Sequence, residues 1–159
     1  MTAPTVRHFR PDDAPALAAI FHAAVHGLAA RDYSPEQRRA WSATLGDPAR
    51  WTARAADGRT TLVAVDAADK PIAYADLERD GHIDQFYRHP DHPSCAATLY
   101  HALEAVARAW GLARLHTEAS EPARRFLERR GFVAAARRDF VLHGVSIHNW
   151  AMAKPLGPA

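Results

Sequence analysis

The hydrophobic positions in the first third of the chain recur with the period of a helix. They follow a short alternating strand at 6–9 and comprise Leu17, Ile20, Phe21, Ala24 and Leu28. Pro11 and the two aspartates after it are typical of a first helical turn. Ser34, followed by a proline and then by Gln37, predicts the N-cap and capping box of a second helix. A third short helix is expected at 47–51.

The hydrophobic period then changes to that of strands. Residues 60–65 and 71–77 are predicted to form a hairpin, and Asp80-Gly81 is a hairpin turn that leads into a third strand at 82–87. The later elements are a helix at 95–110, a strand at 114–117, a helix at 120–130 capped by Ser120, and two strands from 132 to 152 joined near His143. A strand–loop–helix–strand unit among hairpins predicts a mixed α/β sheet with helices on both faces. We expect a single domain at 1–156 and a short tail at 157–159.

Composition and charge exclude several functional classes. The 159 residues are 48% hydrophobic and 24% charged, which is typical of a globular protein and not of a disordered one. The net charge is only +2 and the arginines are interleaved with acids, so we expect no nucleic-acid partner. The uncharged stretch at 14–30 is too short and too rich in alanine for a membrane span, and early charges argue against a signal peptide. A lone cysteine favours a reducing, cytoplasmic location.

The segment from Asp84 to Leu99 carries the first chemical signal. A strand ends there, and a helix begins with five small residues: Ser94, Cys95, Ala96, Ala97 and Thr98. The unpaired N–H groups and the dipole of a helix start attract anions, and small side chains let a phosphate approach. The alternative is a helix start selected only for tight packing.

Five stretches of this chain together resemble the GNAT superfamily of acetyl-CoA-dependent N-acetyltransferases. They are the hairpin LVAVDAADKPIAYADL, the strand and loop IDQFYRHPDH, the helix LYHALEAVARAWGLARL, the segment TEASEPARRFLERRGF and the ending GVSIHNWAMAKPL. The resemblance spans nearly the whole chain. It implies a mostly antiparallel sheet of about seven strands with a splay between the fourth and fifth strands, where coenzyme A binds.

The resemblance also implies where the cofactor acetyl-CoA lies. Its pantetheine would pair with the strand at Phe86, Tyr87 and Arg88, as an added strand does. Its pyrophosphate would lie on residues 94–98, and Arg129 is a candidate for the 3′-phosphate. Ser120 and Phe126 belong to the helix that would flank the thiol end.

Two positions depart from the family pattern. Ser94 and Ala96 stand where the phosphate loop of the family has glycines, and Leu127 stands where many members have a tyrosine that protonates the leaving thiolate. These departures favour one alternative, a relative that kept the fold and binds a ligand without catalysis. A second alternative is transfer from a longer acyl-CoA, or to a hydroxyl.

The implied reaction is direct attack by a primary amine of a small molecule on acetyl-CoA within a ternary complex. The amine must lose a proton first, so a base is required. Asp84 and Glu118 are the main candidates, with His82 and His116 beside them on the same two strands. Tyr87 is a candidate acid. Tyr33, Trp41 and His82 are expected to line the acceptor pocket, and a homodimer is one expectation because such folds often pair.

Two other kinds of site compete with this interpretation. Cys95 at a helix start is expected to have a lowered pKa, which a cysteine hydrolase would need together with a histidine such as His92 or His116. The histidine pairs His22/His26 and His89/His92 have metal-ligand spacing, but neither pair has a third ligand that completes a known metal-binding pattern. We therefore expect no metal site.

Overall fold

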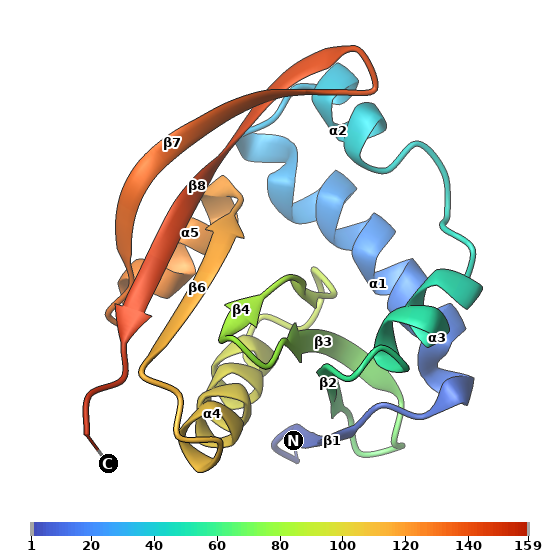
Figure 1. Cartoon of the computed structure of the whole chain (residues 1–159). Helices are drawn as coiled ribbons and strands as arrows, with labels where there is room; N and C mark the ends of the chain where they lie inside the picture. Colours follow the sequence, from blue (N-terminus) through green and yellow to red (C-terminus); the bar gives the residue numbers. More distant parts are fainter. Residues whose placement is uncertain (1, 159) are drawn as a thin grey trace.

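The computed structural model describes residues 2–158 of the chain, and within them eight strands form two sheets that helices flank (Figure 1). The strands are β1 (Thr5–His8), β2 (Thr60–Val65), β3 (Pro71–Leu77), β4 (His82–Ile83), β5 (Phe86–Arg88), β6 (Arg114–Ala119), β7 (Val133–Leu142) and β8 (Val145–Pro155). The helices are the 3-10 helices η1 (Pro11–Asp13) and η2 (Leu28–Arg31) and the α-helices α1 (Ala14–Gly27), α2 (Pro35–Trp41), α3 (Ala49–Ala55), α4 (Cys95–Ala109) and α5 (Glu121–Glu128). The predicted tail ends at Ala159, which lies outside the described residues.

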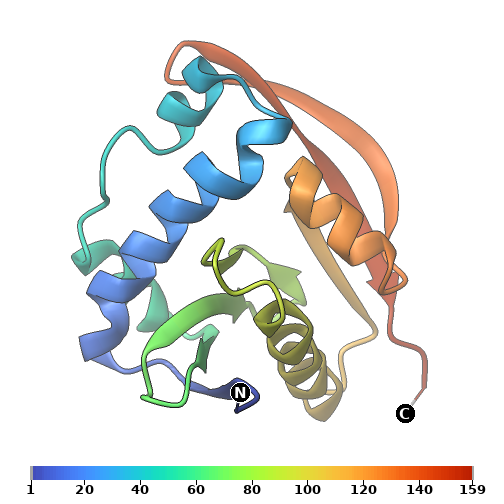
Figure 2. The same ribbon diagram turned by 180° about the vertical axis from the view of Figure 1, so that it is seen from behind.

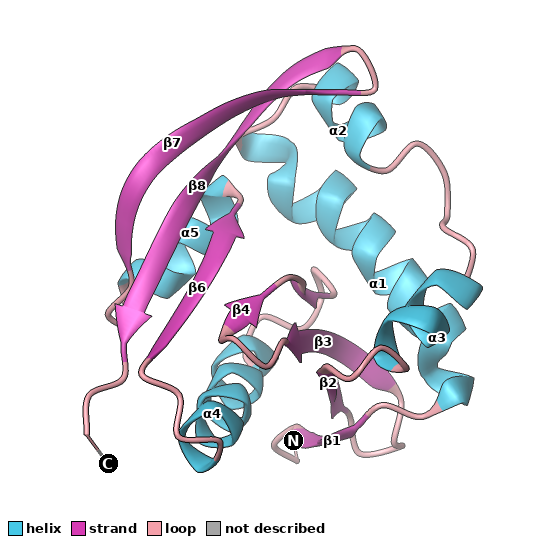
Figure 3. Cartoon of the chain, in the orientation of Figure 1, coloured by secondary structure: helices cyan, strands magenta, loops and turns pink. Residues whose placement is uncertain are grey.

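The strands form two four-stranded sheets, in the orders β1-β2-β3-β5 and β4-β6-β8-β7 (Figure 3). All neighbours are antiparallel except β4 and β6, which are parallel. The predicted mixed α/β fold is therefore confirmed. The prediction of a single strand at 82–87 is wrong in one respect. The strand breaks at 84–85, and its two halves join different sheets.

The break is held by the carboxylate of Asp76, which is only 2% exposed. Its Oδ1 accepts hydrogen bonds from the backbone N–H groups of Asp84 (3.1 Å) and Gln85 (2.9 Å). Its Oδ2 accepts from the guanidinium groups of Arg54 (2.7 Å) and Arg59 (3.0 Å). Buried backbone donors need partners, so this side chain satisfies the two N–H groups that the break takes out of the strand ladder.

Helices cover both faces of the first sheet, as the sequence predicts (Figures 1 and 2). Alternate residues of β2 point to opposite sides, so Leu62 joins the core under α4 while Val63 joins the core under α1. Strands that are buried on both faces read as continuous apolar runs, which explains the run at 62–65.

The N-terminal helical run corrects one expectation. Residues 11–31 form 21 helical residues with a mean hydropathy of 1.2, long and apolar enough by length and composition to cross a membrane. The uncharged stretch at 14–30 is shorter than this helical run, because the helical conformation extends into the polar residues on both sides of it. In this fold 44% of its most apolar window is buried, and Leu17 and Ile20 pack against the first sheet. The run is a core helix of this structure.

The remaining element boundaries follow from caps and turns. Ser34 and Gln37 form the predicted capping box of α2, and the side chain of Ser120 caps α5. The helix at 120–130 ends earlier than predicted, at Glu128, and Gly131 follows with φ of 93°. The last strand is longer than predicted because it pairs with β6 as far as Pro155.

We expect Asp76→Ala to lower the free energy of unfolding by about 3 kcal/mol, because it leaves two partly buried N–H groups unpaired and removes a buried carboxylate from its arginine partners. Urea denaturation followed by circular dichroism measures this loss. Asp57→Asn is the matched control, since Asp57 also pairs with Arg59 but its carboxylate is exposed. Equal losses in the two variants would contradict the role of Asp76.

Candidate active site

Two cavities of about 510 Å³ each meet where the two sheets diverge. The hairpin-side cavity, so named because β7 and β8 border it, also contains Asp84 and Glu118. The helix-side cavity lies among α1, the start of α4, and α5. Six residues line both cavities: Trp41, Phe86, Tyr87, Ser120, Ala123 and Phe126. The two cavities are thus the two sides of one passage through the splay.

The edge of β5 that faces this passage is unpaired. Gln85 O and His89 N bond to β3, and hydrogen-bonded positions alternate in an antiparallel ladder. The N–H and C=O groups of Phe86 and Arg88 therefore point away from β3, while those of Tyr87 point toward it. Such an edge can bind an extended amide chain as an added strand. Of the three predicted strand contacts, the backbone of Phe86 and Arg88 is available and that of Tyr87 is not.

The helix-side cavity fits an anionic ligand. Its lining contains four arginines, namely Arg31, Arg88, Arg125 and Arg129. Arg125 is paired with Asp32 at 2.7 Å, and Arg88 donates to the carbonyls of its own loop. The start of α4 lies at the same cavity, and Ser94 makes no side-chain cap there. The N–H of Cys95 donates to His92 O at 3.4 Å, and the N–H groups that follow it in the first turn stay available. Arg31 and Arg125 were not predicted, because these cations come together from separate elements and form no motif.

Only Ala96 of the five small residues at the start of α4 lines this cavity. Cys95 is 0% exposed, and its thiol donates to the carbonyl of His92 at 3.0 Å. Burial raises the pKa of Cys95, so the expected lowering of its pKa is wrong. Burial removes the water that would stabilise a thiolate at Cys95. This loss raises the pKa of the thiol by more than the helix dipole lowers it. A reactive cysteine at this position is not supported.

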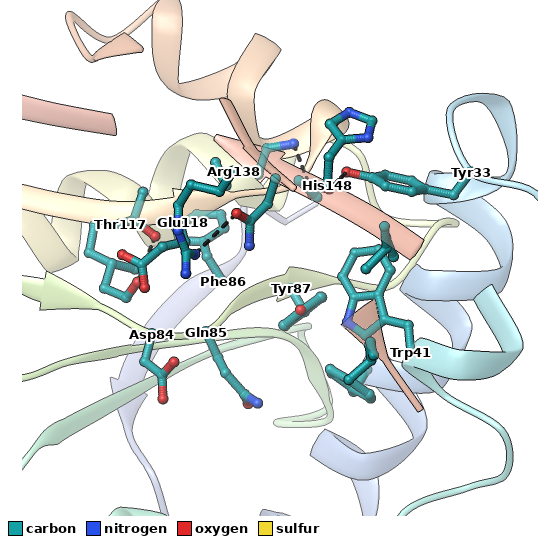
Figure 4. A pocket seen from close by; sticks show the side chains of 18 of the residues that line it. Tyr33, Trp41, Asp84, Gln85, Phe86, Tyr87, Thr117, Glu118, Arg138 and His148 are labelled. Atoms are coloured by element: carbon teal, nitrogen blue, oxygen red, sulfur yellow. Dashed lines mark hydrogen bonds between the residues drawn. The ribbon is translucent and has the colours of Figure 1, made fainter. Parts of the chain in front are cut away.

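Asp84 lines the hairpin-side cavity (Figure 4), and two ion pairs hold its carboxylate. Its Oδ2 lies 2.5 Å from Arg54 Nη2 and 3.1 Å from Arg59 Nη1. Burial acts to raise the pKa of Asp84, but the hydrogen bonds and charges of the two guanidinium groups hold it below its usual value. Asp84 is therefore committed to the cluster around Asp76, and its basicity is low.

Glu118 lies on the opposite wall of the splay, on β6, with its side chain 38% exposed. It contacts His82 Nε2 at 3.0 and 3.2 Å, and His82 Nδ1 lies 2.8 Å from Glu78. Burial acts to lower the pKa of His82, but the two carboxylates raise it. His82 lies behind Glu118 and does not line either cavity, unlike the acceptor contact that was predicted.

Tyr87 lies at the junction of the cavities and is surrounded by aromatic rings. Its ring centroid is 4.8 Å from that of Phe21 and 6.3 Å from that of Trp41, both edge-on. Burial raises the pKa of Tyr87, so its phenol stays protonated near neutral pH. Leu127 lines the hairpin-side cavity from α5 and has no proton to donate.

Tyr33 and Trp41 line the hairpin-side cavity, at the end away from Asp84 (Figure 4). The Tyr33 phenol donates to His148 O (2.9 Å) and accepts from Glu121 N (3.1 Å). Burial is the main cause that raises the pKa of Tyr33 to about 12. The Tyr33 hydroxyl is thus occupied in joining η2 to β8 and α5. Ser120 and Phe126 line both cavities, and the Phe126 ring lies 5.4 Å from Phe86.

Comparison with known proteins places this geometry in a family. Residues 29–154 match the model of the acetyltransferase (GNAT) domain. The crystal structure of a GCN5-related N-acetyltransferase from Rhodopseudomonas palustris is 39% identical, with a TM-score of 0.88 and 98% of each chain covered. The uncharacterized N-acetyltransferase YafP of Escherichia coli is 27% identical over 92% of this chain and 93% of its own.

A structural neighbour has been solved with the cofactor. The acetyltransferase YncA from Salmonella typhimurium, in a structure with acetyl-CoA, superposes with a TM-score of 0.72 at 20% identity, covering 99% of this chain and 96% of its own. At that identity the likeness concerns the fold. The domain match and the Rhodopseudomonas relative carry the family assignment: the chain belongs to the GNAT acetyltransferases.

Proposed function

We propose that this enzyme transfers the acetyl group of acetyl-CoA to a primary amine of a small molecule, by direct attack within a ternary complex. The observation that carries the proposal is the passage through the splay, which has an unpaired strand edge inside it and a cavity on each side. Two substrates can therefore enter from opposite sides and meet at Phe86. That arrangement suits transfer without a covalent enzyme intermediate.

The helix-side cavity is the proposed acetyl-CoA site. The carbonyl of Phe86 and the backbone groups of Arg88 would pair with the pantetheine amides, as an added strand does, which leaves the N–H of Phe86 for the acetyl oxygen. First-turn N–H groups of α4, together with Arg31, Arg88 and Arg129, would bind the phosphates. Acetyl-CoA supplies an activated thioester to the site. Alanine and serine at the start of α4 keep the backbone donors, because neither residue blocks ordinary helical geometry.

Glu118 is the proposed base. An alkylammonium group has a pKa of about 10.4, so the enzyme must remove a proton before attack. Glu118 faces the hairpin-side cavity and has no arginine partner among the described residues, whereas Asp84 has two. Its carboxylate would accept the proton directly or through a water. The Phe86 N–H would donate to the developing oxyanion.

Tyr87 is the proposed acid that returns a proton to the leaving sulfur. It lines both cavities, so its side chain borders the passage in which the two substrates would meet. Its raised pKa keeps the proton available. Tyr87 would thus take over the role of the tyrosine that position 127 lacks.

The hairpin-side cavity is the proposed acceptor site. A cavity of about 510 Å³ suits a small molecule. Trp41 and Phe140 offer apolar surface, and Arg50 and Arg138 offer positive charge. A lone, buried cysteine is compatible with the cytoplasmic location that we propose.

The direct test is an acceptor screen. Purified enzyme, acetyl-CoA and a panel of primary amines, matched alcohols and longer acyl-CoA donors are analysed by mass spectrometry of the products. We expect acetylated amines that form only with active enzyme. Acylated alcohols alone, or turnover only with longer acyl-CoA, would contradict the proposed acceptor or donor.

Glu118→Gln is expected to lower kcat by about 100-fold, the usual contribution of a positioned base. Asp84→Asn is the matched control, because it removes the other candidate carboxylate from the same cavity; its expected loss of kcat is much smaller. Steady-state kinetics with the best amine from the screen measures both. A larger loss in the Asp84 variant would assign the base to Asp84.

Tyr87→Phe is expected to lower kcat by about tenfold, with little change in the KM for acetyl-CoA. The loss is modest because a thiolate with a pKa near that of cysteine, about 8.5, leaves fairly well without protonation. Tyr100→Phe, a buried tyrosine of the main core, controls for the loss of a phenol. If kcat is unchanged in the Tyr87 variant, another group protonates the thiolate.

Arg129→Ala is expected to raise the KM for acetyl-CoA by about tenfold, the worth of one hydrogen bond to a charged group. The KM for S-acetylpantetheine, which lacks the nucleotide, is expected to stay the same. Arg137→Ala, on the exposed strand β7, is the control. Equal effects on both donors would show that Arg129 does not bind the phosphates.

A further inference from the structure

We propose that His82, His116 and Glu118 form a zinc site on the paired strands β4 and β6, next to the hairpin-side cavity. One ligand atom from each residue lies within 4.8 Å of the other two. The imidazole rings of His82 and His116 stack, with centroids 5.1 Å apart and an interplanar angle of 25°. A small movement of these side chains brings three donors to the distances that a Zn²⁺ ion needs.

The strand register explains why these three residues meet. β4 and β6 pair in parallel with His82 opposite His116. Side chains in a strand alternate between faces, so Glu118 lies two residues along β6 on the same face as His116. The adjacent residues Leu115 and Thr117 are buried on the other face. The cluster therefore rests on the parallel pairing that the break at 84–85 makes possible.

The donor set fits zinc in kind as well as in place. Two imidazoles and one carboxylate are a usual three-ligand set for zinc, and the fourth position stays open to water. Further carboxylates surround the rings: Glu78 contacts His82 Nδ1 at 2.8 Å, and Asp80 lies 3.7 Å from His116 Nε2. Carboxylates in this second layer orient metal-bound imidazoles and strengthen binding. They also surround a dication with negative charge.

Among residues 2–158, neither of the other two histidine pairs has a third donor close enough to both rings to complete a metal site. His22 and His26 lie 4.5 Å apart by ring centroids, but both are hydrogen bonded to Ser42. His89 and His92 lie 5.8 Å apart, with Asp91 82% exposed beside them. The spacing of histidines that are close together in the chain predicts no metal site. The ligands of the proposed site come from strands 34 residues apart in sequence.

Zinc at this site would inhibit acetyl transfer. The ion would bind the carboxylate oxygens of Glu118, which could then no longer accept a proton from the acceptor amine. This part of the inference rests on the proposed function, because it uses Glu118 as the base. The binding itself does not depend on any activity.

Binding is tested by titrating the tag-free, metal-free chain with zinc chloride in a calorimeter. We expect one equivalent at a micromolar Kd, and His116→Gln to weaken binding about tenfold or more. His92→Gln is the matched control and is expected to bind like the unaltered chain. Circular dichroism verifies that the variants fold, and His82→Asn serves as a second ligand variant. No saturable binding, or unchanged binding in both ligand variants, overturns the site.

Cobalt and activity provide two further readouts. Co²⁺ in place of zinc is expected to give the strong visible bands of a four-coordinate ion, and these bands are expected to vanish in His116→Gln. In an assay that follows the acetylated amine by chromatography, zinc is expected to inhibit the unaltered chain reversibly with a chelator and to spare His116→Gln. Zinc that binds at these ligands without inhibiting would leave the site standing and overturn the role of Glu118 as base.

Discussion

The carboxylate of Asp76 is the interaction on which the rest of this structure depends. It is nearly fully buried, and it satisfies two backbone N–H groups and two guanidinium groups at one point. Without this carboxylate, residues 82–88 would form one continuous strand beside β3. Because Asp76 substitutes for the lost ladder bonds, the strand changes sheets there, and β5 and β6 diverge beyond it. The cavities, the unpaired edge of β5 and the parallel pair of β4 and β6 all follow from that divergence.

The same cluster divides the acidic residues of the splay into two kinds. Asp84 pairs with Arg54 and Arg59 and so helps to hold the break at 84–85. Glu118 belongs to the histidine side and keeps part of its carboxylate open to the cavity. Residue type alone does not separate these two carboxylates; their partners do. A buried ion cluster thus determines both the shape of the cleft and which acidic group is left for chemistry.

Much of the fold could be predicted from the sequence because local signals agree with it. The capping box at Ser34, the hairpin at 60–77 and the cap at Ser120 each act over a few residues. The break at 84–85 could not be predicted, because it depends on a carboxylate eight residues earlier and on arginines from α3 and the loop after it. The burial that raises the pKa of Cys95 is likewise tertiary, and so is the meeting of four arginines at the helix-side cavity. The helix start at 94–98 was predicted from its small residues and most other site residues from the family resemblance, whereas the ion pairs and hydrogen bonds of these residues are visible only in the structure.

The central claim is that the unpaired edge of β5 binds acetyl-CoA. Amide hydrogen exchange followed by NMR, with and without saturating acetyl-CoA, tests it most directly. We predict that exchange slows at the N–H groups of Phe86 and Arg88, while Tyr87, already bonded to β3, changes little. Unchanged exchange at Phe86 and Arg88 in the presence of millimolar acetyl-CoA would contradict this account.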